Sequence, residues 1–412
     1  MTPETAPPRP GTKPGRPEAS ITQRVTSLEL FFDLVFVYTL TQLTVLIAHD
    51  LSWPTAGRVV LIFTVLYWMY SAYAYLTNQV PPDRPSRRVL MLLGMAGFLI
   101  CALSIPHAFD PHSNAGVVFG LGLLLVVLVH SVLYTRGHGR DTVWYAVPNS
   151  AAALAVTGAG LCTGLLADGL WVLAIALQFL TPLMAEHGPA RGSGRATSEL
   201  RAQMGALHPG HFVERHGLLL IVSLGESIIA IGVGIGDLPF TASVFTGVFL
   251  ALALAGALWW TYFVRDEGGA EHAFAATPAD RRWRLAMTAY YYTFLPMLLG
   301  VAFLAAGIKK SLGHIGEHLH TGPALALAGG VALFLAGDVA FRSAMRLFPV
   351  GYRALAVPVA LATALLGIHV SALVQLLGLV AALVVMLAAE ARWSPRASTV
   401  ADAATPVGTE GT

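Results

Sequence analysis

The segment LELFFDLVFV, Leu28 to Val37, places two carboxylates, Glu29 and Asp33, in a run that is otherwise apolar. The two acids are four residues apart, so a helix would put both side chains on one face. A membrane-spanning helix needs about 20 mostly apolar residues, because backbone polar groups in lipid must be hydrogen-bonded within the segment. The run around these acids is long enough, so it predicts a spanning helix with ionisable groups inside it.

Composition indicates that the whole chain is a membrane protein. Of its 412 residues, 55% are hydrophobic and only 12% are charged, which is too apolar for an ordinary soluble domain. The net charge of +2 is small and the basic residues form no long block, so we expect no nucleic-acid partner. Cys101 and Cys162 both fall within apolar runs, which indicates neither a disulfide framework nor a thiolate metal site.

Apolar runs long enough to span a bilayer recur along the chain. They predict an all-α fold, a polytopic helical membrane protein with about 12 transmembrane helices. The eleventh run is the weakest, because it is short and Pro358 interrupts it. The predicted spans are 27–48, 55–77, 89–109, 115–135, 142–165, 169–185, 211–235, 241–263, 284–307, 322–344, 352–368 and 371–392.

The positions of Lys and Arg indicate which side of the membrane each loop faces. Short cytoplasmic loops retain positive charge, whereas exported loops do not. If the N-terminus is inside, all of the 25 Lys and Arg residues except Arg58, Lys309 and Lys310 fall on the inner side. A wrong number of spans would break this alternation. We therefore predict a multi-pass protein of the cell membrane with both termini in the cytoplasm.

The longest hydrophilic segment between spans, EHGPARGSGRATSELRAQMGALHPG, divides the chain into two parts. Six predicted spans precede it and six follow, so both parts would enter the membrane in the same direction, as parallel repeats do. The predicted organisation is a disordered cytoplasmic tail at 1–22, a first six-helix half at 23–185, a cytoplasmic linker at 186–210, a second six-helix half at 211–393 and a disordered cytoplasmic tail at 394–412.

Acidic side chains within the predicted spans are candidate functional residues, because a charge at the bilayer centre costs roughly 3 kcal/mol. Glu226 lies near the middle of span 211–235, among small residues. Small residues allow close helix approach and also leave room for water or substrate. Glu226 is therefore the strongest candidate for an ion or proton site.

Glu29 and Asp33 fit two interpretations. They can form an ion or proton site, or they can pair with an arginine such as Arg24 or Arg215 and thereby join two helices. Asp338 and Arg342, four residues apart near one end of span 322–344, predict a structural ion pair within one helix.

One short motif is typical of an enzyme. HIGEH, His314 to His318, matches the H-x-x-E-H pattern of a class of zinc peptidases. That chemistry needs both histidines on one helical face, whereas this segment contains Gly316 and lies in a short predicted loop. The chain also has no phosphate-binding or dinucleotide-binding fingerprint. We therefore expect no metal site and no cofactor.

Two longer motifs resemble a known family. SLELFFDLVFVYTLTQLT at Ser27–Thr44 and HFVERHGLLLIVSLGESIIAIG at His211–Gly232 are similar to two motifs of the bacterial low temperature requirement A (LtrA) family. The resemblance covers most of the chain. It implies a membrane protein connected by name with growth in the cold, and it supplies no molecular activity. The motif positions that carry over are Glu29, Asp33, Glu214, Arg215 and Glu226.

These observations support two hypotheses from different classes. The first is a transport protein in which Glu226 and Asp33 bind a cation or relay protons while Arg215 balances their charge. The second is a non-transporting membrane protein of envelope homeostasis, whose buried charges only join helices. An intramembrane enzyme is a minor alternative, because no nucleophile and base occur together, and we expect no enzyme. The expected partners are the lipid bilayer and a cation or proton, and the sequence does not indicate an oligomeric state.

Overall fold

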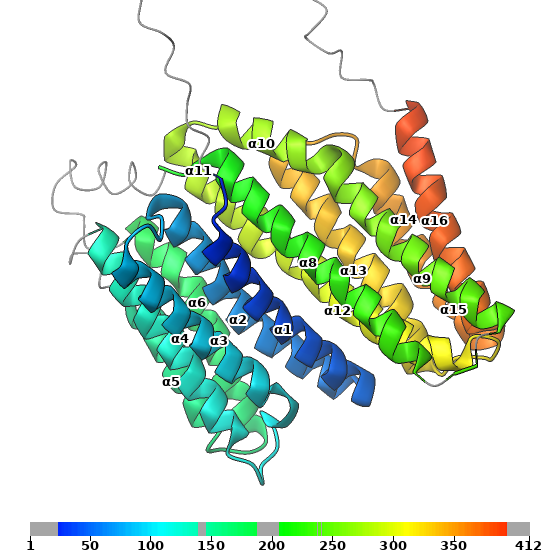
Figure 1. Cartoon of the computed structure of the whole chain (residues 1–412), viewed down its shortest axis with the longest axis horizontal. Coiled ribbons are helices and arrows are strands. Elements are labelled where there is room, and N and C mark those ends of the chain that lie inside the picture. The colour runs from blue at the N-terminus through cyan, green and yellow to red at the C-terminus, as the bar shows by residue number, and fades with distance from the viewer. Residues whose placement is uncertain (1–23, 139–145, 188–205, 237, 240, 394–412) are drawn as a thin grey trace, which may run out of the picture.

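The computed structural model describes residues 24–138, 146–187, 206–236, 238–239 and 241–393. Within these ranges the chain forms helices and no strand (Figure 1). The all-α prediction is therefore confirmed. The tails predicted at 1–22 and 394–412 lie outside the described residues, as does most of the predicted linker at 186–210.

The long helices of the described chain are joined by short loops and by irregular turns. The π-helical turn η4 (Tyr262–Asp266) joins α9 to α10. A second π-helical turn, η5 (Met287–Tyr292), follows α11 and precedes α12. The helices are α1 (Ser27–His49), α2 (Trp53–Gln79), α3 (Pro85–Ser104), α4 (Ala115–His138), α5 (Ala146–Ala159), α6 (Leu165–His187), α8 (Pro209–Ile235), α9 (Ala242–Thr261), α10 (Glu267–Ala276), α11 (Ala279–Ala286), α12 (Phe294–Ser311), α13 (Thr321–Met345), α14 (Gly351–Ala362), α15 (Ala364–His369) and α16 (Ala372–Trp393).

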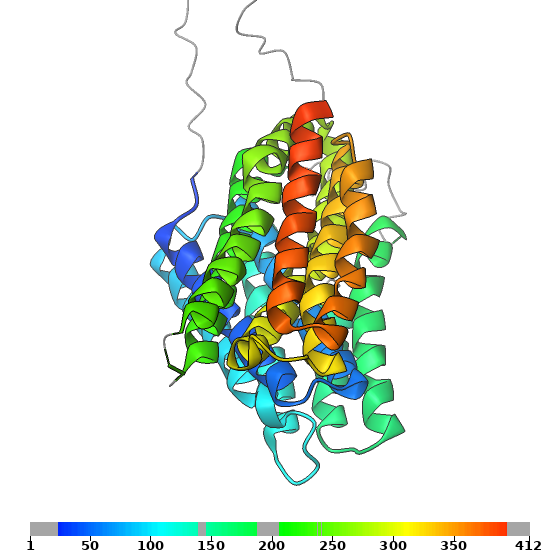
Figure 2. The same ribbon diagram turned by 90° about the vertical axis from the view of Figure 1, so that its right-hand side faces the viewer.

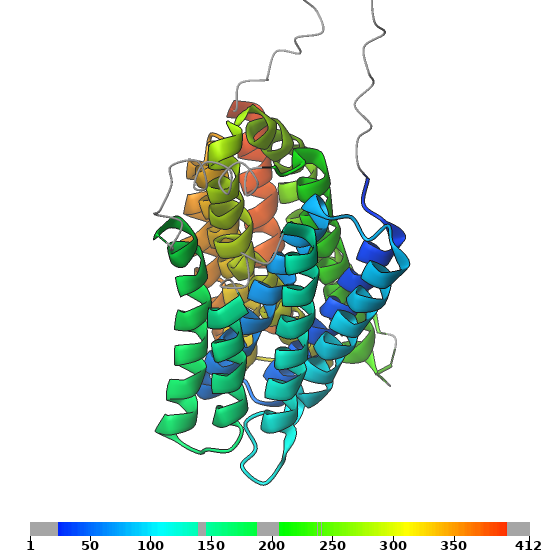
Figure 3. The same ribbon diagram turned by 90° about the vertical axis from the view of Figure 1, so that its left-hand side faces the viewer.

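Eleven helices or continuous helical runs of the described chain are long and apolar enough to cross a membrane. Each of them coincides with one of the predicted spans. The remaining predicted span, 142–165, contains α5 (Ala146–Ala159), and its first residues, 142–145, lie outside the described part of the chain. Helix α5 packs against α4 and α6 (Figure 3), in the place expected for the fifth of the twelve predicted spans.

The helices form two groups that meet along α1, α2, α8 and α12. In Figure 1, α2 to α6 lie on one side and α9 to α16 on the other. Helices α1 and α2 each contact α8 and α12 across the boundary. Helix α1 begins and α16 ends at the same end of the bundle, which is uppermost in Figures 1 and 2 and is called the upper end below.

The outer faces of the bundle are apolar. Large hydrophobic side chains such as Leu34, Leu121, Leu165 and Val385 are more than half exposed. A soluble monomer does not expose apolar surface of this extent, whereas a lipid-facing helix does. The outer surface therefore supports a membrane location independently of helix length.

Two glycines set a close helix crossing between α12 and α13. A Cβ atom built on Gly300 would lie 2.6 Å from the carbonyl oxygen of Gly330, and a Cβ on Gly330 would lie 2.5 Å from the backbone nitrogen of Leu304. Any side chain here would push the backbones apart, so small residues are required at the crossing. Helix α12 is thereby fixed against α13 on one face, while it contacts α1 and α8 on another.

Candidate functional site

The N-terminus of α1 fixes the position of Glu29. Thr26 is the N-cap, and its backbone N–H and hydroxyl both donate to Glu29 Oε2, at 2.9 and 2.8 Å. This reciprocal arrangement is a capping box, in which the N-cap residue and the third helical residue satisfy each other. Glu29 is thus held at the first turn of α1, with its other carboxylate oxygen directed towards α8.

Arg215 of α8 joins both acids of the first segment. Its Nη1 lies 3.0 Å from Glu29 Oε1, and its Nη2 lies 3.4 Å from Asp33 Oδ1. All three side chains are buried, and Arg215 is 0% exposed. A buried guanidinium needs such partners, because an unpaired charge in a low-dielectric interior is strongly unfavourable. Of the two arginines considered as partners from the sequence, Arg215 is the one that binds.

Helix α2 completes this cluster with residues that the sequence did not single out. Tyr70 donates its hydroxyl to Asp33 Oδ1 at 2.8 Å, and Arg215 Nη1 donates to Thr77 Oγ1. The guanidinium carbon of Arg215 also lies 5.6 Å from the ring centroid of Phe32 and 5.8 Å from that of Tyr70, within the range of cation–π attraction. Three helices therefore meet at one arginine.

His211 extends the cluster towards the end of α2, and its neighbours define its tautomer. The backbone N–H of His208 donates to Asn78 Oδ1 at 2.9 Å, so the Asn78 amide nitrogen faces His211 Nδ1, 3.1 Å away. Nδ1 is therefore an acceptor, and Nε2 carries the hydrogen that it donates to Glu29 Oε2 at 3.3 Å. With this hydrogen-bond pattern His211 is neutral.

The cluster consequently holds one carboxylate more than it has cations. Glu29 and Asp33 face the single charge of Arg215. Asp33 Oδ2 is buried and has no hydrogen-bond partner among the described residues. A carboxylate oxygen in that position can take up a proton or a small cation, because either one would neutralise the excess charge.

Glu226 lies deeper in the bundle, where α8 faces α1. It is 3% exposed and is about 16 Å along the helix axis from Arg215, at 1.5 Å per residue. Thr41 of α1 donates its hydroxyl to Glu226 Oε2 at 2.7 Å. No salt bridge joins Glu226 to any residue of the described chain. The hydroxyl of Thr44 also lies close enough to interact with Glu226, and the hydroxyl of Ser227 is buried without a hydrogen-bond partner among the described residues.

Glu214, the remaining candidate, lies apart from both sites. It is only half-buried, and it occupies the face of α8 that packs against α10. Gly210 and Gly217 flank it on this face, and their positions meet the carboxylates of Glu271 and Glu267. The structure therefore brings Glu29, Asp33 and Arg215 together. Glu226 lies apart from them, deeper in the bundle, and Glu214 lies on the face of α8 that packs against α10.

A second buried cluster of charges joins η4, α13, α14 and α16. Arg353 Nη1 lies 2.6 Å from Asp266 Oδ2 and 2.6 Å from Asp338 Oδ2, and its Nε lies 3.0 Å from Glu390 Oε2. Arg342 Nη1 lies 2.5 Å from Glu390 Oε1. Three acids thus share two guanidinium groups, so this cluster also has one excess carboxylate.

The predicted ion pair between Asp338 and Arg342 is wrong. Each residue has another partner: Asp338 binds Arg353, and Arg342 binds Glu390 and approaches Asp266. A spacing of four residues allows an ion pair within one helix. Here Asp338 instead pairs with Arg353 of the neighbouring α14 at 2.6 Å. Arg353 and Glu390 gave no sequence signal beyond a charge close to a span end.

The HIGEH segment forms a loop turn between α12 and α13. His314 Nδ1 lies 3.0 Å from Glu317 Oε2, with both side chains exposed, and His318 Nδ1 contacts the backbone oxygen of Ile368 at 3.2 Å. The motif's residues therefore point to different partners. Within the described ranges, no group of three His, Cys, Asp or Glu side chains has the geometry to hold a metal ion.

Together the apolar outer faces, the spanning helices and the buried charges define a class: an integral, multi-pass, helical membrane protein. The bacterial low temperature requirement A protein (LtrA) family matches residues 24–389. The chain belongs to this family. It is 28% identical over 326 residues to an uncharacterized protein, RA0937, of Rhizobium meliloti (strain 1021), a match that covers 76% of this chain and 75% of the relative. No solved structure matches the chain.

Proposed function

We propose that this protein transports a proton or a small cation across the cell membrane, and that Glu226 is the carboxylate that binds it. The observation that supports this proposal is the isolation of Glu226. The other buried acids described above, Glu29, Asp33, Asp266, Asp338 and Glu390, each contact an arginine, whereas Glu226 contacts the hydroxyl of Thr41. Lys309 acts on the charge of Glu226 only at longer range, without a salt bridge. A buried carboxylate without a direct ion pair is stabilised by a proton or a bound ion.

Asp33 is the second residue of the proposed pathway. Its Oδ1 is held by Arg215 and Tyr70, while its Oδ2 is free to accept a proton. On α1, Asp33 and Thr41 are eight residues apart, which corresponds to about 12 Å. Protons cannot pass directly over this distance, so transfer between Asp33 and Glu226 requires water molecules or a movement of the helices.

Reconstitution in liposomes tests the proposal. Purified protein is incorporated into vesicles that contain a pH-sensitive dye, and pH, sodium and potassium gradients are applied in turn. We expect flux in vesicles with the wild-type protein, and loss of most of that flux with Glu226→Gln. The amide keeps the side-chain shape and the bond from Thr41, so the variant should retain its thermal stability.

Glu317→Gln is the matched control, because Glu317 is an exposed glutamate in a loop. Its flux should equal that of the wild type. The proposal is wrong if folded wild-type protein moves none of these ions, or if Glu226→Gln transports as well as the control. Asp33→Asn should reduce flux as well, since it removes the second acid of the pathway.

The two charge clusters favour a second function, in which buried charges only join helices and nothing crosses the membrane. Arg215 connects α1, α2 and α8, and Arg353 connects η4, α13 and α16. In that case, Glu226→Gln and Asp33→Asn would change thermal stability alone. Stability loss without any measurable flux in the wild type would favour this function.

A further inference from the structure

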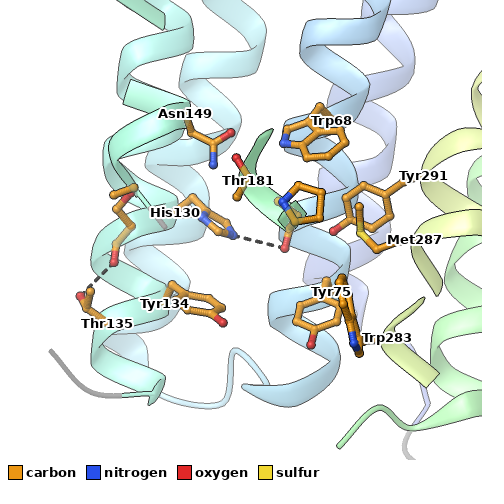
Figure 4. A pocket seen from close by; sticks show the side chains of 14 residues that line it. Trp68, Tyr75, His130, Tyr134, Thr135, Asn149, Thr181, Trp283, Met287 and Tyr291 are labelled. Carbon is orange, nitrogen blue, oxygen red and sulfur yellow. Dashed lines mark hydrogen bonds between the residues drawn. The ribbon is translucent and has the colours of Figure 1, made fainter. Parts of the chain in front are cut away.

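A cavity lies between α2, α4, α5, α6 and the turn η5, within the upper part of the bundle. Its volume is about 100 Å³, which approaches the ~150 Å³ of an apolar cavity that binds a single aromatic ring. Figure 4 shows the side chains that line it. Five aromatic rings are among them, those of Trp68, Tyr75, Tyr134, Trp283 and Tyr291.

The crossing of α3 with α4, next to this cavity, has the same geometry as the crossing of α12 with α13. A Cβ built on Gly97 of α3 would lie 3.0 Å from the carbonyl oxygen of Gly122 and 3.1 Å from the nitrogen of Val126, both in α4. A Cβ built on Gly300 of α12 would lie 2.6 Å from the carbonyl oxygen of Gly330 and 2.6 Å from the nitrogen of Phe334, both in α13.

The two crossings also match when the contacts are measured from the glycines of α4 and α13. The Cβ position of Gly122 meets Cys101, four residues after Gly97, and that of Gly330 meets Leu304, four residues after Gly300. The surrounding helix pairs also recur: α1–α3, α4–α5 and α2–α6 have counterparts in α8–α12, α13–α14 and α9–α16. Helices α3 and α4 therefore correspond to α12 and α13 residue by residue at the crossing.

This correspondence assigns a counterpart to each cavity residue on α4. His130 is eight residues after Gly122, and Asp338 is eight residues after Gly330. In the same register, Tyr134 corresponds to Arg342. The second group of helices thus fills this place with the ion cluster around Arg353, whereas the first group has an aromatic-lined space.

We propose that the cavity between α2, α4, α5, α6 and η5 binds a small, uncharged aromatic molecule. The binding does not depend on ion transport through Glu226, which lies on α8 outside this cavity. The two sites can therefore be tested separately.

The ligand is uncharged because the described lining of the cavity offers no partner for an ion. Among the described residues, this lining contains no Asp, Glu, Lys or Arg side chain, and its titratable rings are those of His130, Tyr75, Tyr134 and Tyr291. A charge placed there would lose its hydration without gaining an ion pair. The corresponding place in the second group holds three acids and two arginines that form ion pairs with one another, and the described lining of the cavity has no such ion pairs.

The ligand is aromatic because the walls are flat rings on several sides. Trp68 packs edge-on to Tyr291 at a centroid distance of 5.4 Å, and the rings of His130 and Tyr134 stack at 5.8 Å. An added ring can continue this offset or edge-to-face packing, which is worth about 0.5–1.5 kcal/mol per ring pair beyond area burial. An aliphatic lipid chain would gain no such contacts.

Two polar groups in the walls can orient such a ligand. The hydroxyl of Thr181 is buried and has no hydrogen-bond partner among the described residues. His130 Nε2 lies 3.3 Å from the carbonyl oxygen of Ala72 (Figure 4). A carbonyl oxygen only accepts, so Nε2 carries the hydrogen and a neutral ring keeps Nδ1 as an acceptor. A ligand N–H or O–H matches these two groups.

Indole is a suitable probe, because it is flat, uncharged and carries one N–H donor. Cys101 is buried, so a maleimide dye that fluoresces on reaction with a thiol reports unfolding in a Cys162→Ser background. We expect indole to raise Tm in proportion to the logarithm of its concentration, since a ligand that binds only the folded state stabilises it. Tetramethylammonium, a small cation, should leave Tm unchanged.

Ala146→Phe and Val147→Phe form the matched pair of variants. Ala146 lines the cavity, whereas Val147, next to it on α5, is 60% exposed. The shift with indole should disappear in Ala146→Phe and persist in Val147→Phe. If Ala146→Phe does not fold, Thr181→Val keeps the shape of the wall, removes the hydroxyl and should reduce the shift.

Each of the following outcomes would overturn the proposal. One is an equal shift with indole in wild type and both variants, which would place binding elsewhere in the bundle. Another is a cavity-dependent shift with tetramethylammonium alone, which would assign the site to cations. The third is the absence of any shift with indole in the folded wild type, or a co-purified lipid that Ala146→Phe releases.

Discussion

Arg215 is the side chain on which the upper contact of α1, α2 and α8 depends. It is fully buried, and it binds Glu29, Asp33 and Thr77. Its removal would leave two carboxylates without a cation in an apolar environment. The loss of one partner from such a buried group is costly, because the remaining charge keeps its desolvation penalty and loses its compensation.

We therefore expect Arg215→Met to lower the free energy of unfolding by about 3–5 kcal/mol, the usual loss when one member of a buried ion pair is removed. Denaturant titration in detergent measures it. Arg265→Met is the control, because Arg265 is exposed, and it should have little effect. Adding Glu29→Gln and Asp33→Asn to Arg215→Met should restore part of the loss. An unchanged stability in Arg215→Met would mean that the cluster does not join the helices.

The residues of this cluster were only partly predictable. Glu29, Asp33 and Arg215 stand out because a charge inside an apolar run is rare, and Arg215 was one of two possible partners. Tyr70 and Thr77 could not be found in this way, because Tyr and Thr are common in α2 and neither is charged. Their role depends on how α2 is rotated against α1 and α8, which the sequence pattern does not specify.

The crossing of α12 and α13 shows how small residues fix a pair of helices. Gly330 faces the backbone of Leu304, whereas a Cβ on the adjacent Gly329 would meet nothing within 4 Å. The two glycines therefore differ only in their surroundings. An alanine at either position gains helix propensity, worth about 0.5–1 kcal/mol.

Gly330→Ala is expected to destabilise the protein, because its new methyl group would lie 2.5 Å from the Leu304 nitrogen and would separate the two helices. Gly329→Ala is expected to be neutral or stabilising, since only the helix propensity changes. Thermal unfolding of both variants measures the difference. Equal Tm values would show that the helices shift at little cost.

Apolar length predicted where the helices lie, but irregular turns within the helices were not predictable. The runs Ala242–Ala276 and Ala279–His314 each contain a π-helical turn, η4 or η5. Residue Asp266 lies in η4, where it reaches Arg353. A hydropathy profile detects the apolar run but not a change in the hydrogen-bonding step, so this contact had no signal in the sequence.

The predicted division of the whole bundle into two halves, 23–185 and 211–393, stays a prediction. Recurring helix pairs and the two glycine crossings support a repeat. The sequence could suggest this division through the number of spans. It could not show that one group contains a cavity where the other contains an ion cluster, since His130 and Asp338 are not similar residues.

The side of the membrane on which the termini lie follows from charge and can be measured. We expect both termini in the cytoplasm, because all of the 25 Lys and Arg residues except three fall on the side predicted to be inner. Helix α1 begins and α16 ends at the same end of the bundle (Figure 1), so one side must hold both. Fusion of green fluorescent protein to the C-terminus should give fluorescent cells, whereas alkaline phosphatase at the same point should be inactive.

An insertion of alkaline phosphatase at Asp110–Ser113, in the loop between α3 and α4, is the control and should be active. This loop contains no Lys or Arg and lies at the opposite end of the bundle, where exported loops are expected. Active phosphatase at the C-terminus would reverse the orientation. The buried clusters around Arg215 and Arg353 would then lie in the outer half of the membrane. Asp33 would be at the outer end, rather than the cytoplasmic end, of the proposed pathway.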